Sequence, residues 1–241
     1  MSSPSTEARI QSLEKEVNAL KKQVKARDKQ LQTLQDIEDI KRLQCAYGYY
    51  LEHWMGEEII DCFAKDNPEV SGTFVEGTYK GPEGIRKYFG RMKEAPPEFL
   101  HMVMQVSPVI TVAKDGKSAH GRWYGYGGIL SRATQPLDPA IMAVIYEMDY
   151  IKEGGVWKIL KLRLLMHYAY PTRTPQPPPP GASPPPRMKL DPDEWAEYDT
   201  QYPSGYIYPF HYVHPVTGKP TSEAKRNARL KLKPSPFKEW G

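Results

Sequence analysis

Apolar residues recur every three or four positions along the first part of the chain, at Ile10, Leu13, Val17, Leu20, Val24, Leu31 and Leu34. This spacing is an a/d heptad pattern, and it predicts a coiled-coil helix over about four heptads. Charges that attract between parallel chains occupy the flanking g and e positions, at Arg9, Glu14, Glu16 and Lys21. A lone amphipathic helix lying on its own domain would show a wider stripe, so self-association is favoured. The number of strands stays open because Arg27 interrupts the d positions.

A second helical pattern begins at Asp36 and ends near Gly56, with a stripe made of Ile40, Leu43, Tyr47, Tyr50 and Trp54. A short helix over 57–64 follows, and residues 70–79 alternate as a strand hairpin. The next helix carries Ile85, Tyr88, Phe89 and Met92 and is stopped by Pro96 and Pro97.

Period-two alternation then dominates, and it predicts strands over 100–106, 109–113 and 119–129. After a loop at 133–139, residues 146–168 read as a long hairpin with a tight turn at Glu153-Gly154-Gly155. Helices thus precede a mostly antiparallel sheet, which makes the fold class α+β.

The two faces of this hairpin are mixed in character. On the first arm Tyr146, Met148 and Tyr150 share one face, and Glu147 and Asp149 share the other. On the second arm one face is expected to carry Trp157, Ile159, Lys161, Arg163, Leu165 and His167. A sheet containing this hairpin is therefore expected to pack on one side and to enclose something polar on the other.

The composition changes abruptly after Tyr170. Nine of the 17 residues from Pro171 to Arg187 are proline, which predicts a polyproline segment running over the surface. The next segment, 193–215, is rich in Trp, Tyr, Phe and His, and so much aromatic area is expected to wrap onto its own domain or a neighbouring subunit, the alternative being a disordered linker. The chain is therefore expected to consist of three parts: a coiled-coil helix (1–36), a domain (37–170) and an extension (171–241).

The charge pattern argues against nucleic acid as a partner. The net charge is +4, but residues 218–241 hold seven Lys or Arg against two Glu, so the rest of the chain is near −1. Two cysteines, Cys45 and Cys62, suit a reducing compartment, and no apolar leader or membrane-length run is present. We expect a cytoplasmic, soluble homo-oligomer without a membrane partner.

The order of elements and several phrases resemble the SnoaL-like branch of the nuclear transport factor 2 (NTF2-like) superfamily. The phrases are IEDIKRLQCAYGYYLEHWMGEEIIDCFAKD, GTYKGPEGIRKYF, HMVMQVSPVITVAKDGKSAHGRWYGYG and EGGVWKI. The resemblance covers about residues 36–170 and implies a cone of curved antiparallel sheet, capped by N-terminal helices, with a pocket at its mouth. The superfamily includes cofactor-free cyclases, dehydratases, isomerases and lyases, and also binding modules without chemistry.

Within that branch, the long aromatic extension and the tyrosine-rich pocket are similar to the lignin diarylpropane lyases. These enzymes remove a hydroxymethyl group as formaldehyde and leave a stilbene without a cofactor. The six histidines, at 53, 101, 120, 167, 211 and 214, show no metal-binding spacing, and no phosphate loop or nucleotide fingerprint occurs. The sequence thus predicts neither a metal nor a cofactor.

Candidate catalytic groups come first from the helix after Asp36 and from the strand after Leu100. Tyr47 and Tyr50 share one helix face and can donate to a developing oxyanion, or can simply pack as core aromatics. Trp54 follows on the same stripe and is a candidate for substrate binding. His101 is expected to share a strand face with Gln105. It can exchange a proton near neutral pH, unless its ring nitrogens are occupied by structural hydrogen bonds.

The later strands supply the remaining candidates. Arg122, Tyr124 and Tyr126 share a strand face, and an inward guanidinium needs a carboxylate, for which Glu147 is the natural partner. That pair is either catalytic or a structural ion pair. Lys161 and His167 line the pocket if the face of Trp157 does, and are solvated if the register is reversed. Tyr208 and His211 from the extension could close the pocket, although packing on the outside is favoured.

These residues suggest a cofactor-independent lyase acting on a small aromatic substrate. His101 or Glu147 would remove a proton, and Tyr47, Tyr50 and Arg122 would polarise the departing oxygen. A dehydratase or polyketide-type cyclase is the alternative within the enzyme class. A non-catalytic oligomeric scaffold is the alternative outside it.

Overall fold

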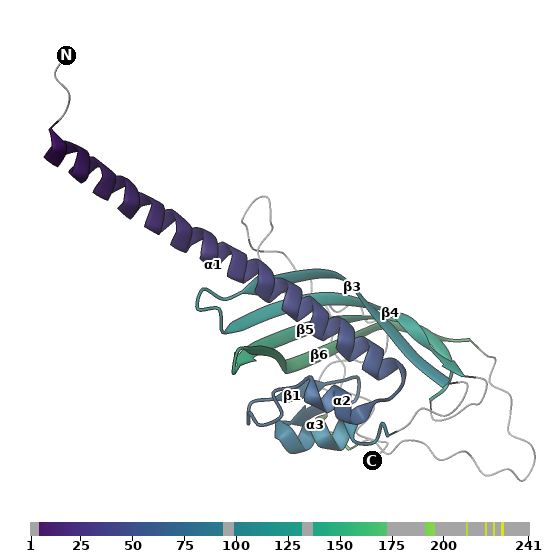
Figure 1. The fold of residues 1–241 in the computed structure, drawn as a ribbon. Helices are drawn as coiled ribbons and strands as arrows, with labels where there is room; N and C mark the ends of the chain where they lie inside the picture. The colour runs from purple at the N-terminus through teal and green to yellow at the C-terminus, as the bar shows by residue number, and fades with distance from the viewer. Residues whose placement is uncertain are drawn as a thin grey trace, which may run out of the picture.

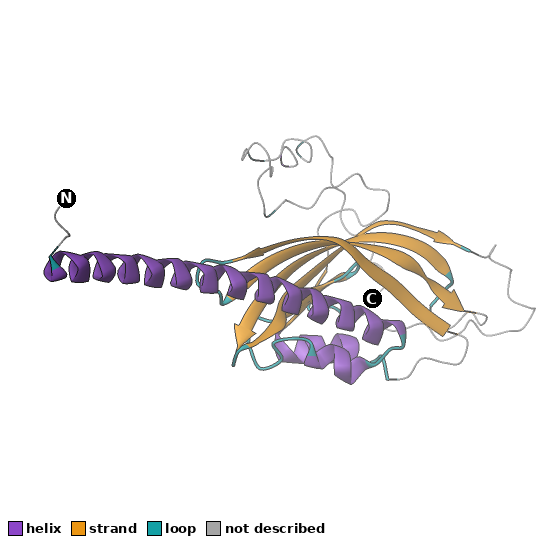
Figure 2. Ribbon diagram, turned by 45° about the horizontal axis from the view of Figure 1, so that its top comes forward, coloured by secondary structure: helices purple, strands orange, loops and turns teal. Residues whose placement is uncertain are grey.

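The computed structural model describes residues 5–93, 99–131, 137–172 and 191–195, together with the single positions 211, 220, 224 and 228. It is a mixed α+β fold in which helices lie against one face of a curved sheet (Figures 1 and 2). The helices are α1 (Thr6–Glu52), α2 (Gly56–Asp61) and α3 (Gly81–Phe89). The strands are β1 (Ser71–Thr73), β2 (Gly77–Lys80), β3 (Phe99–Val112), β4 (Ser118–Ser131), β5 (Ala140–Glu153), β6 (Val156–Pro171) and β7 (Glu194–Trp195). No described helix is long and apolar enough to cross a membrane.

The sheet has the order β3-β4-β5-β6-β1-β2-β7. All neighbouring strands are antiparallel except β1 and β6, which run parallel. The predicted α+β class with a mostly antiparallel sheet is therefore confirmed. In Figure 2 the long strands arch over α1, so that the helix crosses the concave face of the sheet.

The long hairpin that was predicted around Gly154 and Gly155 is formed by β5 and β6. Both glycines have positive φ, at 59° and 82°. A two-residue turn of this kind matches the twist of the flanking strands, and only residues without a Cβ adopt it readily.

The two helical patterns that meet at Asp36 form one continuous helix, α1, of 47 residues. Asp36 therefore lies inside the helix and does not begin a second one. Its side chain is instead buried and accepts hydrogen bonds from Lys152 Nζ (2.6 Å), Trp157 Nε1 (3.0 Å) and Gln32 Nε2 (3.1 Å). Burial opposes ionisation of Asp36, but these donors outweigh it and hold its pKa below the ordinary value.

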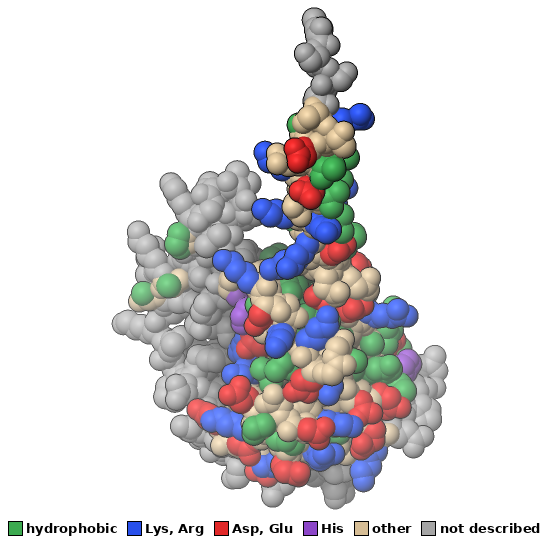
Figure 3. Space-filling view, turned by 60° about the vertical axis from the view of Figure 1, so that its left-hand side comes forward, with side chains coloured by type: hydrophobic (Ala, Val, Ile, Leu, Met, Phe, Trp, Pro, Cys, Tyr) green, Lys and Arg blue, Asp and Glu red, His purple; other side chains and the backbone are tan. Residues whose placement is uncertain are grey.

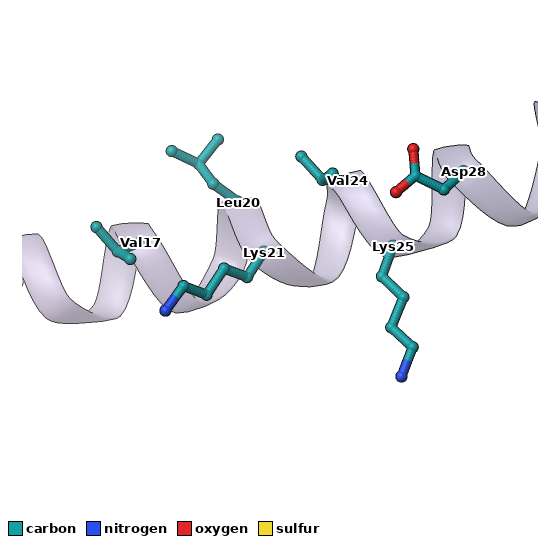
Figure 4. Close-up of a pocket in the computed structure, with 6 residues that line it drawn as sticks. All are labelled: Val17, Leu20, Lys21, Val24, Lys25 and Asp28. Carbon is teal, nitrogen blue, oxygen red and sulfur yellow. The ribbon is translucent and has the colours of Figure 1, made fainter.

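The first half of α1 projects away from the sheet (Figure 1). The residues of the heptad stripe are between 46% and 63% exposed, so no described part of the chain covers them. Figure 3 shows apolar side chains in a row along this projecting segment, with charged side chains beside them. Figure 4 shows Val17, Leu20 and Val24 on one side of the helix and Lys21 and Lys25 pointing to the other.

Two strands differ from the predicted ones because of β-bulges. β3 runs unbroken from Phe99 to Val112, with a register shift at Ser107, whose φ is 53°, and Pro108. β6 has extra residues opposite β5 at Leu160 and at His167. A bulge inverts the alternation beyond it, because two residues oppose one. Trp157 and Ile159 therefore share the concave face with Leu162 and Leu164, and not with Lys161 as predicted.

Little of the C-terminal extension falls within the described residues. Glu194 and Trp195 add a short strand beside β2, and the Asp193 carboxylate accepts a hydrogen bond from the backbone N–H of Lys80 at 2.6 Å. Most of residues 193–215 lie outside the described residues, so the wrapping of this aromatic segment onto its own domain or a neighbouring subunit stays a prediction. The proline-rich segment (residues 173–187) and Tyr208 lie outside the described residues.

Candidate active site

A cavity of about 260 Å³ lies on the concave face of the sheet, bounded by α1, α3 and the turn between β1 and β2. Most of its wall is apolar. Polar groups enter it from five residues on different elements, namely Tyr47, Glu76, Tyr88, His101 and Tyr146. The apolar wall is made of Leu51, Phe74, Val75, Phe89, Met92, Val103, Ile129, Leu137, Met142, Val144, Leu164 and Met166.

His101 lies on β3, is half-buried and lines the cavity. Its Nδ1 atom accepts a hydrogen bond from the indole N–H of Trp54 at 3.4 Å. The surrounding protein atoms disfavour the imidazolium, and burial lowers the pKa of His101 to about 4. The ring is therefore neutral at neutral pH.

Glu76 occupies the turn between β1 and β2 and is 5% exposed. Its Oε1 accepts a hydrogen bond from the hydroxyl of Tyr79 at 3.3 Å. Burial raises the pKa of Glu76, although this hydrogen bond, one from the residue's own backbone and the nearby charge of Arg91 oppose the increase. A carboxyl group with a raised pKa in an apolar pocket is common among general acids and bases.

The three phenols stay protonated over the physiological range. Burial is the largest cause in each case and raises the pKa of Tyr47, Tyr88 and Tyr146. Tyr47 and Tyr146 lie edge to face with ring centroids 6.3 Å apart, and their hydroxyls interact with each other. The cavity therefore offers neutral hydroxyl donors beside one carboxyl group and one imidazole.

The residues predicted on helix α1 and strand β3 divide into two groups. Tyr47 and His101 line the cavity. Gln105 lies behind the wall, where it donates to the backbone carbonyl of Val103 at 2.6 Å and interacts with Tyr146. Tyr50 is half-buried and packs against the core without lining the cavity. Trp54 stands behind His101 and does not line the cavity either.

The remaining predicted residues lie on the opposite face of the sheet. Tyr146 and Tyr150 face α1, as the hydrogen bond from Tyr150 to Gln44 Oε1 (2.7 Å) shows, so Glu147 between them must point away. Arg122 pairs with Glu147 across the strands at 2.5 Å, and both side chains are buried. The outer face also carries Tyr124, Tyr126, Lys161 and His167.

The prediction that Glu147 and Arg122 act beside His101 therefore needs correction, since the sheet separates them from the cavity. The same separation removes Tyr124, Tyr126, Lys161 and His167 from contact with a ligand bound there. His167 lies close enough to Arg122 that burial and this positive charge together lower its pKa. His211 packs on the outer face, as favoured, with its Nδ1 3.3 Å from Glu147 Oε2.

Three cavity residues were not among the predicted site residues. Tyr146 and Tyr88 were assigned only to a strand face and a helix stripe, and Glu76 fell within the predicted hairpin over 70–79 without being singled out. Glu76 did carry a signal, because it is a lone carboxylate between Val75 and Gly77 in a segment that is otherwise apolar or neutral. Among the described residues, no three His, Cys, Asp or Glu side chains come together as a metal-binding group.

Comparison with solved structures finds several chains with a similar arrangement of elements. One, from Novosphingobium aromaticivorans and provisionally assigned as a scytalone dehydratase, shares 16% identity with a TM-score of 0.49, covering 64% of this chain and 98% of its own. A hexachlorocyclohexane dehydrochlorinase (LinA, type 2) shares 20% identity with a TM-score of 0.47 over 64% of this chain and 99% of its own. The type 3 enzyme from Novosphingobium barchaimii shares 21% identity with a TM-score of 0.47 over 62% and 99%.

No curated protein matches the sequence of this chain. The family model for the SnoaL-like domain does match, over residues 32–163, which is more than half of the 241 residues. The match begins inside α1 and ends inside β6, and it contains all five residues that bring polar groups into the cavity. The chain therefore belongs to the SnoaL-like domain family.

Proposed function

We propose that this protein is a cofactor-independent lyase that uses acid–base catalysis on an aromatic small molecule. The observation that carries the proposal is the cavity of about 260 Å³, in which a carboxyl group, an imidazole and three phenols converge within an apolar wall. Ligand sites commonly combine an apolar lining with a few convergent polar groups of this kind. The aromatic and aliphatic wall suits a planar ring, and the polar groups suit its oxygen substituents.

An elimination needs a group that removes a proton and a group that assists the leaving oxygen. In this cavity Glu76 and His101 are the groups able to exchange or share a proton, and the neutral hydroxyls of Tyr47 and Tyr146 support donation to an oxygen. Each positioned acid or base commonly contributes about 10² to 10⁴ in rate. These acid, base and hydrogen-bond donor groups are suited equally to carbon–oxygen and to carbon–carbon bond cleavage.

The specific reaction we propose is the deformylation of a lignin-derived diarylpropane diol. The base takes the proton of the primary alcohol, the oxygen forms the carbonyl of formaldehyde, and the carbon–carbon bond to the neighbouring carbon breaks. Its electron pair forms the central double bond of a stilbene and expels the benzylic hydroxyl, which leaves as water after gaining a proton. One proton is removed and one is supplied, so no oxidant or reductant is needed. A dehydratase or a polyketide-type cyclase or isomerase is the alternative reaction.

Incubation of purified, chelator-treated protein with diarylpropane diols tests this reaction directly. We expect equal amounts of trapped formaldehyde and stilbene, and we expect His101→Ala to abolish both. A dehydrated diol without formaldehyde would support the dehydratase alternative and contradict deformylation. If neither diols nor related aromatic alcohols give any product, the proposal of a lyase is wrong and the non-catalytic scaffold is favoured.

We also propose that the projecting half of α1 binds a second copy of the chain. The exposed heptad stripe provides an apolar seam (Figure 3), and the charges at Arg9, Glu14, Glu16 and Lys21 are complementary between two parallel copies. A helix this exposed is marginal in water without a partner, because its stability depends on packing of the apolar face. The seam would hold catalytic domains together without contributing to the cavity.

Replacing Leu20 by Glu should dissociate the assembly, because the seam would then bury a charge at a d position. Asn18→Glu is the matched control, since it introduces the same charge at a b position outside the stripe. Sedimentation or light scattering should report an oligomer for the wild type and for Asn18→Glu, and a monomer for Leu20→Glu. A wild-type monomer at tens of micromolar, or an unchanged mass for Leu20→Glu, would show that the seam has no such role.

A further inference from the structure

Trp54 occupies an unusual backbone position at the end of α1. The helix ends at Glu52, and Trp54 adopts φ +56°, one of two positive values among the described non-glycine residues. Its N–H donates to the carbonyl of Leu51 at 3.1 Å, and the N–H of Met55 donates to that of Tyr50 at 3.0 Å. Glycine is the usual residue where a helix ends in this left-handed conformation, because a Cβ is disfavoured there.

The conformation of Trp54 therefore needs a compensating reason. A residue held in a sparsely populated backbone region costs about 1–3 kcal/mol, and such residues cluster at functional sites. Trp54 is 6% exposed, and its indole lies edge-on to Phe99 with ring centroids 5.0 Å apart. This packing fixes the direction of the indole N–H, which points to Nδ1 of His101.

The direction of that hydrogen bond determines where the proton of His101 resides. An indole nitrogen can only donate, so Nδ1 of His101 must accept with its electron pair. A neutral imidazole carries one proton, which is then on Nε2. Since Nδ1 is held by Trp54 behind the wall, Nε2 is the nitrogen left for the cavity that His101 lines.

We propose that Trp54 is a positioning residue that fixes His101 in the Nε2–H form, so that His101 donates a hydrogen bond to a substrate oxygen and Glu76 is the proton acceptor. The substrate class implied is one with a hydroxyl or carbonyl oxygen next to an aromatic ring. This inference rests on the proposed function for its catalytic consequence, but the position of the proton does not depend on it.

The other cavity groups support this division of roles. The low pKa of His101, about 4, keeps the ring neutral, so Nδ1 continues to accept from Trp54 throughout the neutral range. The phenols of Tyr47 and Tyr146 remain protonated because burial raises their pKa. Among the described cavity groups, the carboxylate of Glu76 then remains as the group with an electron pair available to take a proton.

Nitrogen NMR of protein labelled with ¹⁵N-histidine tests the assignment without any substrate. Long-range proton–nitrogen correlations distinguish a protonated ring nitrogen from an unprotonated one, and the spectrum of His101→Gln identifies the signals of His101. We expect protonated Nε2 and unprotonated Nδ1 in the wild type at pH 7. Trp54→Phe removes the donor and should shift the Nδ1 signal and populate both tautomers. Trp157→Phe, which removes an indole donor to Asp36 instead, should leave the His101 signals in place.

A wild-type signal with the proton on Nδ1 would overturn the inference, whether or not Trp54→Phe folds. If a substrate is found, Trp54→Phe should lower kcat by about 10- to 100-fold, as when other partners that orient a functional histidine are removed. An unchanged kcat in a folded Trp54→Phe protein would also contradict it. Failure to turn over any substrate, with the Nε2 proton observed, would instead refute the lyase and leave the tautomer assignment standing.

Discussion

Replacement of Glu76 by Gln is expected to lower the turnover of the lyase by about 10² to 10⁴-fold, the usual contribution of a positioned acid or base. The amide keeps the shape of the carboxyl group and can still accept from the hydroxyl of Tyr79, but it cannot take up a proton. The variant should fold normally. Burial raises the pKa of Glu76, so the folded protein disfavours the carboxylate, and at pH values above that raised pKa the neutral amide should be at least as stable.

The pH dependence of turnover gives a second measurement on the same residue. Because Glu76 must be ionised to accept a proton, wild-type activity should fall as the pH drops through the raised pKa of this carboxyl group. The residual activity of Glu76→Gln should lack that acidic limb. Glu83→Gln is the matched control, since the side chain of Glu83 is 92% exposed and lies outside the cavity. Retained turnover in Glu76→Gln, or loss of turnover in Glu83→Gln, would contradict the assignment.

Glu76 also shows where prediction from the sequence reached its limit. The alternation of residues 70–79 indicated a hairpin, which β1 and β2 form, but a short hairpin does not show which way its turn points. That direction is set by the parallel pairing of β1 with β6, between residues about 90 positions apart in the chain. Local periodicity contains no information on such a contact, so the buried turn carboxylate was not predicted.

His101 and Tyr47 could be predicted because their elements were long and their residue types chemically informative. The stripe of α1 brings Tyr47 against the concave face, and the parity of β3 places His101 on the same side as Val103. Close packing reinforces this arrangement, since a Cβ at Gly48 would lie 2.1 Å from Gln105 Oε1. Trp54 was predicted to bind substrate, but its left-handed backbone turns the indole behind His101 instead, and no sequence pattern predicts that conformation.

For the residues of β4, β5 and β6, the main error concerned which face of the sheet lines the cavity. Alternation correctly separated Tyr146 from Glu147, but it could not say which of the two faces carries the cavity. The aromatic face turned out to be the enclosed one, because α1 packs on it through Tyr150 and Gln44. The bulge at Leu160 then moved Lys161 to the opposite face from Trp157. A bulge of this kind depends on strand pairing and leaves little trace in composition.

Replacement of Arg122 by Met is expected to lower the free energy of unfolding by up to about 3–5 kcal/mol, the usual cost of removing one partner of a buried ion pair, because the only other described partner of Glu147 is His211, whose Nδ1 lies 3.3 Å from Oε2. Arg122 and Glu147 are 9% and 5% exposed, so water cannot solvate the carboxylate that remains. Turnover should be unchanged in the folded fraction, because the pair lies on the face of the sheet opposite the cavity. Denaturant unfolding monitored by circular dichroism, with kcat measured on the same sample, checks both statements.

Two companion variants make the Arg122 experiment decisive. Arg163→Met removes a guanidinium that pairs with Asp149 at 2.8 Å but is 32% exposed, so its cost should be smaller, about 1 kcal/mol or less. The double variant Arg122→Met with Glu147→Met should recover part of the lost stability, since it replaces a buried pair by apolar side chains and leaves no stranded charge. A loss of kcat in folded Arg122→Met, at unchanged stability, would show that the Arg122–Glu147 pair takes part in catalysis. Because the sheet stands between Glu147 and His101, we expect Arg122→Met to lower the stability of the protein and to leave its kcat unchanged.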